Sequence, residues 1–165
     1  MTTNHKLKGI FLSDRMDWGT PQFIFDHLDK EFKFDLDAAA SDWNKKCNRY
    51  LCAGSLSADW SSLSSSCVWL NPPYGRDIGK WMNKAAEESK KGCSVVCLIF
   101  ARTDTKWWHE SVSKAFEVRL IKRRINFIDP QTKTKGKTGA VAPSALIIYR
   151  PSKRKFPTYT HMEFL

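Results

Sequence analysis

The segment Asn71-Pro72-Pro73-Tyr74 carries the clearest chemical signal in this sequence. Its prolines restrict the backbone, so the Asn71 side chain and the Pro72 carbonyl can present two acceptors to one planar NH2 group. Tyr74 offers a flat face on which the ring bearing that amine can stack. Acceptors on the amine hydrogens favour its nucleophilic form and stabilise positive charge developing on the nitrogen. A rigid turn with a packing tyrosine is the structural alternative.

A second segment, DLDAAAS, places Asp37 before the small residues Ala38 to Ser41. Small side chains let a ligand approach the backbone, and Asp37 could receive the ammonium group of a ligand. The segment lacks the glycine pattern that cradles dinucleotide phosphates. The alternative is an ordinary strand end whose alanines pack beneath a helix.

The order of apolar patterns predicts an α/β fold with a mostly parallel central sheet and a C-terminal antiparallel hairpin. Helices are expected after Thr20-Pro21, which should supply the cap and first residue, and over residues 78–91 and 105–114. Strands are expected over residues 32–37, 68–70, 94–100, 118–128 and 145–150. Both chemical segments directly follow strands, where open parallel sheets bind ligands.

The net charge of +10 is unevenly distributed along the chain. Residues 1–110 hold 15 basic and 14 acidic side chains, whereas residues 111–165 hold 12 basic and 3 acidic ones. This excess suits a polyanion such as nucleic acid, although a solvated basic face is the alternative. The candidate phosphate contacts are Lys122, Arg123, Arg124, Lys133, Lys135 and Lys137. Arg102 follows a central strand and either lines the substrate cleft or belongs to a helix cap.

Composition excludes several other classes of protein. No apolar run reaches the 18 residues of a membrane span, and the polar start of the chain lacks the apolar core of a signal peptide. We therefore expect a cytoplasmic protein without a membrane partner. Five cysteines without a Cys-x-x-Cys pair argue against a disulfide framework or a metal site. A single domain over residues 1–165 is expected, with a lead-in (1–13), a C-terminal tail (151–165), and a monomeric or weakly dimeric state.

The joint order of five motifs resembles the phage-type DNA N6-adenine methyltransferases of the Dam family. The motifs are WGTP from Trp18, LDAAAS from Leu36, NPPYG from Asn71, RTDTKW from Arg102, and the Arg124 to Phe127 segment. The resemblance covers Asp17 to Arg150. It implies a Rossmann-like class I methyltransferase fold and methyl transfer from S-adenosylmethionine to adenine in DNA. S-adenosylhomocysteine would be the product, and a phage or prophage in a bacterial cell the source.

The resemblance also implies roles for individual residues. Asn71, Pro72, Pro73 and Tyr74 would bind and activate an extruded adenine, with Phe127 as a second aromatic contact. The cofactor's methionine end would approach the segment of Asp37, Ala39 and Ser41, while Trp18, Thr20 and Pro21 close over the cofactor. Relatives often carry an acid for the ribose after their second strand, but residues 43–58 contain none. Asp59 is the expected substitute, followed by Asp42 and Asn44.

Two alternative functions remain open at the level of sequence. The enzyme could methylate another planar amine or amide, such as cytosine N4, adenine in RNA or a protein glutamine. The basic last third disfavours glutamine, and Asn71 favours adenine over cytosine, for which serine is commoner at that position. Alternatively, the chain could be a basic nucleic-acid-binding protein that has lost cofactor binding.

Overall fold

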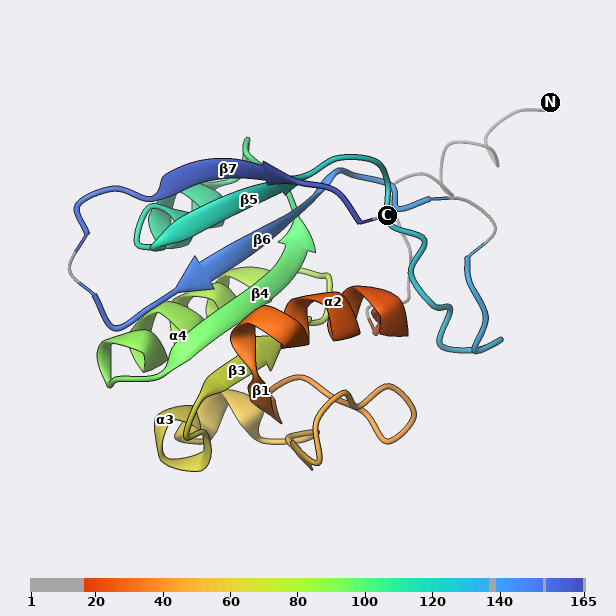
Figure 1. Cartoon of the computed structure of the whole chain (residues 1–165), viewed down its shortest axis with the longest axis horizontal. Coiled ribbons are helices and arrows are strands. Elements are labelled where there is room, and N and C mark those ends of the chain that lie inside the picture. Colours follow the sequence, from red (N-terminus) through yellow and green to blue (C-terminus); the bar gives the residue numbers. More distant parts are fainter. Residues whose placement is uncertain (1–16, 137–138, 153, 165) are drawn as a thin grey trace, which may run out of the picture.

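A computed structural model describes residues 17–136, 139–152 and 154–164 (Figure 1). The expected lead-in, residues 1–13, and Lys137 lie outside these ranges. The five cysteines are all unpaired, and four of them are buried.

The described chain is organised around one seven-stranded sheet in the order β2-β1-β3-β4-β6-β5-β7. The strands are β1 (Phe34–Asp37), β2 (Arg49–Tyr50), β3 (Cys67–Leu70), β4 (Ser94–Phe100), β5 (Glu117–Ile121), β6 (Ser144–Tyr149) and β7 (Thr158–Met162). Every neighbouring pair is parallel except the two that involve β6, which runs antiparallel to both β4 and β5. The expectation of a mostly parallel sheet is therefore confirmed.

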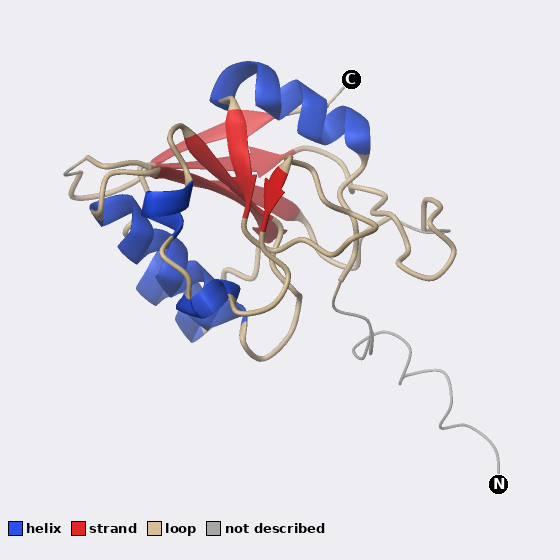
Figure 2. Cartoon of the chain, turned by 90° about the horizontal axis from the view of Figure 1, so that it is seen from below, coloured by secondary structure: helices blue, strands red, loops and turns tan. Residues whose placement is uncertain are grey.

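Helices cover both faces of this sheet (Figure 2). Helix α2 (Gln22–Phe32) lies on one face, and α4 (Ile78–Lys90) lies on the other with the short α3 (Trp60–Leu63). A 3-10 turn, η1 (Ser55–Ser57), and a single π-helical stretch, η2 (Trp108–Val112), complete the set. Side chains of β4 alternate between the two cores: Val95, Cys97 and Ile99 face α4, whereas Val96 and Leu98 face α2. This strand is buried on both faces, which explains its continuous apolar sequence.

The order of the strands reverses direction next to β1. β2 lies on one side of β1, and the next strand in the chain, β3, lies on the other side. Asp37 is the last residue of β1 and pairs in register with Trp69 of β3, so Asn71 follows at the same edge of the sheet. Open α/β sheets bind ligands at such a reversal, outside the carboxyl ends of the strands.

Two of the predicted elements end earlier in the structure than expected. The strand expected over 118–128 ends at Ile121, because Arg123 adopts a left-handed φ of 70° that breaks the extended backbone. The helix expected over 105–114 ends with the π-helical stretch at Val112. Thr105 does not cap it, since its hydroxyl donates to the Arg102 carbonyl oxygen at 2.7 Å.

The C-terminal region also differs from the prediction of a hairpin followed by a tail. β5 and β6 do pair antiparallel, but residues 122–143 separate them and β6 inserts between β5 and β4. The expected tail, residues 151–165, contains β7, which pairs in parallel with β5 from Glu117 to Ile121. Alternation over Thr158–Met162 is weak because this edge strand is largely exposed.

Glu88 of α4 connects this helix to α3 by a hydrogen bond, at the amino ends of the strands. Its side chain is 1% exposed and accepts hydrogen bonds from Lys84 Nζ (2.6 Å), Lys91 Nζ (2.9 Å) and the Ser61 backbone N–H (2.9 Å). Burial raises the pKa of Glu88, but these hydrogen bonds outweigh it and hold the pKa below its usual value. Glu88 is therefore an ionised group on which three donors depend.

We expect Glu88→Gln to lower the free energy of unfolding by about 1–3 kcal/mol at pH 7, because one donor loses its acceptor. Glu87→Gln is the matched control: Glu87 is exposed, and losing its pair with Lys90 should cost at most about 0.5 kcal/mol. A lowered pKa stabilises the fold above the unfolded value and loses this effect as pH falls. Urea unfolding should therefore show the E88Q deficit shrinking below about pH 4.5. A deficit no larger than that of E87Q would contradict this role.

Candidate active site

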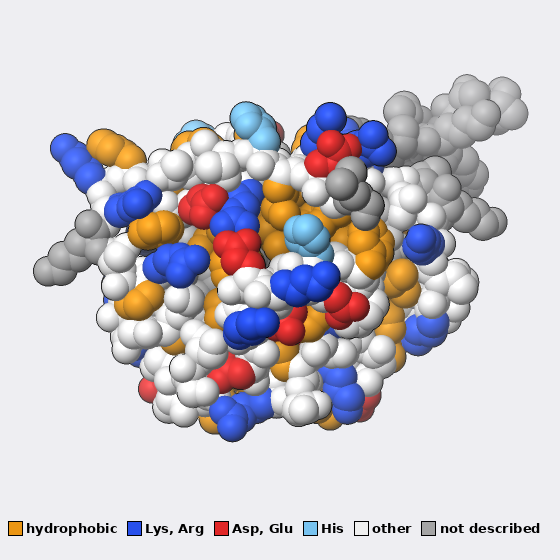
Figure 3. All heavy atoms as spheres, viewed as in Figure 1, with side chains coloured by type: hydrophobic (Ala, Val, Ile, Leu, Met, Phe, Trp, Pro, Cys, Tyr) orange, Lys and Arg blue, Asp and Glu red, His pale blue; other side chains and the backbone are white. Residues whose placement is uncertain are grey.

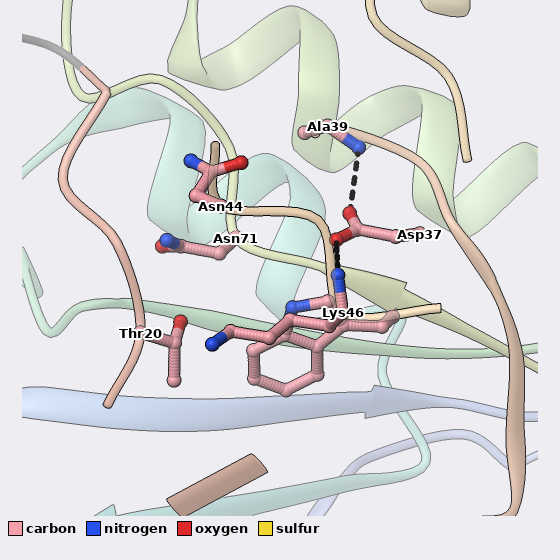
Figure 4. A pocket seen from close by; sticks show the side chains of 7 residues that line it. Thr20, Asp37, Ala39, Asn44, Lys46 and Asn71 are labelled. Carbon is pink, nitrogen blue, oxygen red and sulfur yellow. Dashed lines mark hydrogen bonds between the residues drawn. The ribbon is translucent and has the colours of Figure 1, made fainter. Parts of the chain in front are cut away.

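A pocket opens where β1 and β3 end (Figure 4). The space is open-sided and encloses about 180 Å³. Its lining residues are Thr20, Asp37, Ala39, Asn44, Lys46, Trp69 and Asn71. The two segments that the sequence singled out thus meet in one place, Asp37 from the DLDAAAS segment and Asn71 from the NPPY segment. Asn44 and Lys46 come from the loop after β1.

Asp37 is a buried carboxylate held by the backbone of its own loop. It is 3% exposed, and its two oxygens accept hydrogen bonds from the Ala39 N–H (3.2 Å) and the Lys46 N–H (3.0 Å). Burial raises the pKa of Asp37 to about 6, against the lowering effect of these hydrogen bonds and of the Lys46 charge. At neutral pH the ionised group costs the fold about 3 kcal/mol relative to water. A buried acid kept at such a cost beside a pocket is typical of a binding site.

Two hydroxyl groups at this edge are buried without a hydrogen-bond partner, those of Thr20 and Ser41. Thr20 was expected to cap α2, but the N-cap is Pro21 and no side chain caps this helix. The chain ahead of α2 instead directs the Thr20 side chain toward the pocket (Figure 4). Buried polar groups are normally paired, so an orphan hydroxyl in a pocket lining indicates a ligand that would pair with it.

Asn71 is fixed at both ends of its side-chain amide. Nδ2 donates to the Trp18 carbonyl oxygen at 2.7 Å, and Oδ1 accepts the Tyr74 hydroxyl at 3.1 Å. The Tyr74 hydroxyl also lies 3.3 Å from the Leu98 carbonyl oxygen. Burial raises the pKa of Tyr74 far above its usual value, so the hydroxyl remains a donor. Oδ1 has a second lone pair beside the one that accepts from Tyr74, so it is the atom that Asn71 can offer to a substrate amine.

Three aromatic rings cluster behind Asn71. Tyr74 stacks on Phe100 with ring centroids 4.1 Å apart and an angle of 17° between planes. Phe127 lies 6.0 Å from each of them, nearly edge-on. Phe127, predicted as a second aromatic contact for the base, is buried beside Tyr74. Sequence reasoning missed Phe100, whose only signal was its position at the end of the central strand.

A short backbone strap joins the region of Trp18 to the loop after β5. Gly19 and Ile128 exchange two backbone hydrogen bonds of 3.0 and 2.8 Å. Gly19 also packs against Trp43, since a Cβ there would lie 2.7 Å from a Trp43 ring carbon. The Lys133 ammonium lies over the Trp43 ring, 3.8 Å from its centroid. The strap therefore links the loop after β1 to the turn that carries Lys133.

The structure places Asp59 far from this pocket. Asp59 precedes α3, and its carboxylate accepts hydrogen bonds from the Ser61 hydroxyl (2.6 Å) and Lys91 Nζ (3.3 Å). Lys91 follows the end of α4, at the edge where β4 begins. Asp59 and Asp37 thus lie at opposite edges of the sheet, because the connection through α3 runs back toward the amino ends of the strands. Asp42 remains at the correct edge, where it accepts the Tyr50 hydroxyl at 3.3 Å.

Three of the predicted phosphate contacts already interact with another side chain. Lys122 and Arg123 both pair with Glu163 (3.1 and 2.8 Å), and the Lys133 ammonium lies over the Trp43 ring. Arg102 and Lys135 are exposed, and Arg124 is exposed with its guanidinium 3.3 Å from the Ala140 carbonyl oxygen. On the face shown in Figure 3, basic side chains lie among acidic ones and do not form one continuous patch. Residues 129–134, which carry Lys133, form a turn in which the Asp129 N–H donates to the Thr134 carbonyl oxygen at 2.8 Å.

Comparison with known proteins agrees with the motifs. The profile of the Dam family, described as DNA N-6-adenine-methyltransferase, matches residues 10–163. The chain belongs to this family. One relative is a DNA N-6-adenine-methyltransferase of Haemophilus phage HP1 (strain HP1c1). It is 29% identical to this chain over 144 residues, which are 84% of this chain and 81% of the relative. The resemblance predicted from the sequence is therefore confirmed.

A second Dam relative is the DNA N-6-adenine-methyltransferase of Escherichia phage T1. It is 35% identical over 108 residues, which are 63% of this chain but only 44% of the relative. The aligned part is thus less than half of the phage T1 protein. In the described part of this Dam-family chain, no helix has the length and apolar character of a membrane span. The same residues contain no cluster of three or more His, Cys, Asp or Glu side chains suited to a metal ion.

We expect Gly19→Ala to lower the free energy of unfolding by about 1–3 kcal/mol, because the new methyl group would overlap the Trp43 ring. In a Trp43→Ala background the same change should cost much less, since the overlapping ring is gone. Urea unfolding of both single variants and the double variant measures this coupling. Additive losses would show that Gly19 and Trp43 do not constrain one another.

Proposed function

We propose that this chain transfers a methyl group from S-adenosylmethionine to N6 of adenine in DNA. The observation that carries the proposal is the meeting of Asp37 and Asn71 at neighbouring strand ends around one pocket. The family relationship and the names of the two phage relatives support the same reaction. Incubation with labelled S-adenosylmethionine and unmethylated DNA, followed by nucleoside analysis, tests it. Label in N6-methyl-2′-deoxyadenosine is expected, and label in a cytosine nucleoside or no label in the DNA would overturn it.

We infer a Rossmann-like class I methyltransferase fold with one catalytic domain. The arguments are the parallel β3-α4-β4 unit, the helices on both faces of the sheet and the reversal of strand order beside β1. Such a reversal creates a crevice in which an extended ligand can lie across two strand ends. An enzyme of this kind acts where DNA is, which we take to be the cytoplasm of a bacterial host.

The residues at the pocket fit the methionine end of the proposed cofactor. Asp37 supplies a buried acceptor for its ammonium group, and Thr20 and Ser41 supply unpaired hydroxyls. The pocket is small and open-sided, so it suits one end of the cofactor rather than the whole molecule. Ala39 holds the Asp37 carboxylate, while Trp18 and Pro21 belong to the segment that passes over this edge. Asp59 is not part of the proposed site.

When bound, S-adenosylmethionine supplies an electrophilic methyl group on sulfur. Asn71 Oδ1 would accept a hydrogen bond from the adenine amine, which orients the nitrogen lone pair toward that methyl. The same acceptor would stabilise the positive charge that methylation places on the nitrogen. The amine proton released on methylation would pass to solvent water, which leaves the product amine neutral. Pro72 and Pro73 keep the strand end rigid during this step.

Tyr74 would hold the extruded base by stacking. One face of its ring is already covered by Phe100, so only the opposite face is available to adenine. Phe127 lies nearly perpendicular to Tyr74, with the two ring centroids 6.0 Å apart. Stacking of a base on an aromatic ring contributes about 1–3 kcal/mol.

We expect Asn71→Ala to lower turnover by about 100- to 1,000-fold, the usual effect of removing one preorganised group from a transition state. S-adenosylhomocysteine binding should change less than threefold, because Asn71 faces the base. Tyr74→Phe is the matched control: it keeps the ring but removes the 3.1 Å bond to Oδ1, so a smaller loss is expected. Single-turnover methylation and calorimetry separate the two effects. Wild-type turnover in N71A would refute the assignment.

We propose Arg102 and Lys135 as phosphate contacts, with Arg123, Arg124, Lys133 and Lys137 completing the DNA-binding set. Each lost phosphate contact reduces the slope of log affinity against log salt by about 0.9. The double variant Arg102→Ala/Lys135→Ala should therefore lose about 1.8 of this slope, equally on all DNA sequences. Lys90→Ala, at the opposite edge of the sheet and paired with Glu87, should leave the slope unchanged. An unchanged slope in the double variant would exclude these two contacts.

A further inference from the structure

Lys46 lies in the pocket although no sequence motif pointed to it. Its backbone N–H donates to the Asp37 carboxylate, while its side chain extends along the pocket lining (Figure 4). The Lys46 ammonium donates to a neutral partner, Gln22 Oε1, at 2.8 Å, rather than to the Asp37 carboxylate. Two opposite charges therefore line one small pocket without forming a hydrogen-bonded pair with each other.

The surroundings of Lys46 make an additional anion favourable. The side chain is only partly exposed, and burial lowers the pKa of Lys46 while the charges of Asp37 and Asp26 oppose this effect. An ammonium with a single neutral side-chain acceptor has further donors to offer. The Thr20 hydroxyl, buried and unpaired, lines the same pocket and can donate to the same anion.

We propose that Lys46, with Thr20, binds the carboxylate of the cofactor's amino-acid end while Asp37 binds its ammonium. The inference rests on the proposed function and extends it to a residue outside the motifs. An α-amino acid carries its two charges on one carbon, and a pocket lined by one buried acid and one separate lysine matches those charges in sign. The arrangement would select ligands that keep both charges.

Truncated ligands separate this role from a structural one. S-adenosylhomocysteine carries both charged groups, its decarboxylated analogue carries only the ammonium, and 5′-methylthioadenosine carries neither. Lys46→Ala should weaken S-adenosylhomocysteine binding by about 10- to 100-fold, the usual effect of losing a charged hydrogen bond. It should change the affinity of the other two ligands less than threefold. Asp37→Asn should weaken both ligands that carry the ammonium but spare 5′-methylthioadenosine.

Calorimetry with the full chain measures the three affinities. Lys45→Ala is the matched control, because the neighbouring Lys45 contacts the Tyr50 hydroxyl (3.3 Å) and does not line the pocket. Equal weakening of all three ligands by K46A would show that Lys46 only anchors its loop to α2, which overturns the inference. Wild-type affinity of K46A for S-adenosylhomocysteine would overturn it as well. Failure of the wild-type chain to bind S-adenosylhomocysteine would instead refute the proposed function.

Discussion

The pair of backbone hydrogen bonds to the Asp37 carboxylate is the interaction on which the architecture of this site depends. They come from Ala39 and Lys46, residues on both limbs of the loop after β1, so one side chain sets the path of the whole loop. The same loop carries Asn44 and Lys46 into the pocket and Trp43 against the Gly19 strap. The strap in turn holds Asn71 through the Trp18 carbonyl. A buried charge at the end of β1 is thus connected, through packed backbone, to the residue assigned to the substrate.

The sequence predicted the helices and strands whose formation depends on local patterns of apolar residues. The apolar run of β4 and the amphipathic pattern of α4 were located almost to the residue. The position of the pocket was also predictable, because open α/β sheets bind ligands at strand ends and both chemical segments follow strands. The left-handed Arg123 was not predictable, because positive φ in a non-glycine residue depends on tertiary packing. The edge strand β7 was missed because its alternation is weak and its pairing partner lies far away in sequence.

The site shows the same division between local and tertiary information. The residue types of the NPPY segment alone were enough to indicate the chemistry expected of it. Phe100 and Lys46 gave no such signal, since a phenylalanine ending a strand and a lysine in a loop are ordinary features of any sequence. Asp59 was chosen by its distance along the chain, but α3 carries the backbone to the other edge of the sheet. The edge of the sheet at which a residue lies depends on the direction of the connection that carries it, and this direction cannot be read from spacing along the chain.

The insertion of β6 between β4 and β5 has a consequence for how the chain assembles. β5 is made before β6 but contacts β4 only through it, so β5 has no place in the sheet until residues 144–149 have been synthesised and paired. The segment between them carries Phe127 and the Lys133 turn. Pairings between distant residues form slowly because the intervening chain must first be ordered. The wall that carries Phe127 and Lys133 should therefore be among the last parts to form, while the strand ends that carry Asp37 and Asn71, on β1 and β3, draw on residues already available. Nascent chains would pass through a state with half an active site.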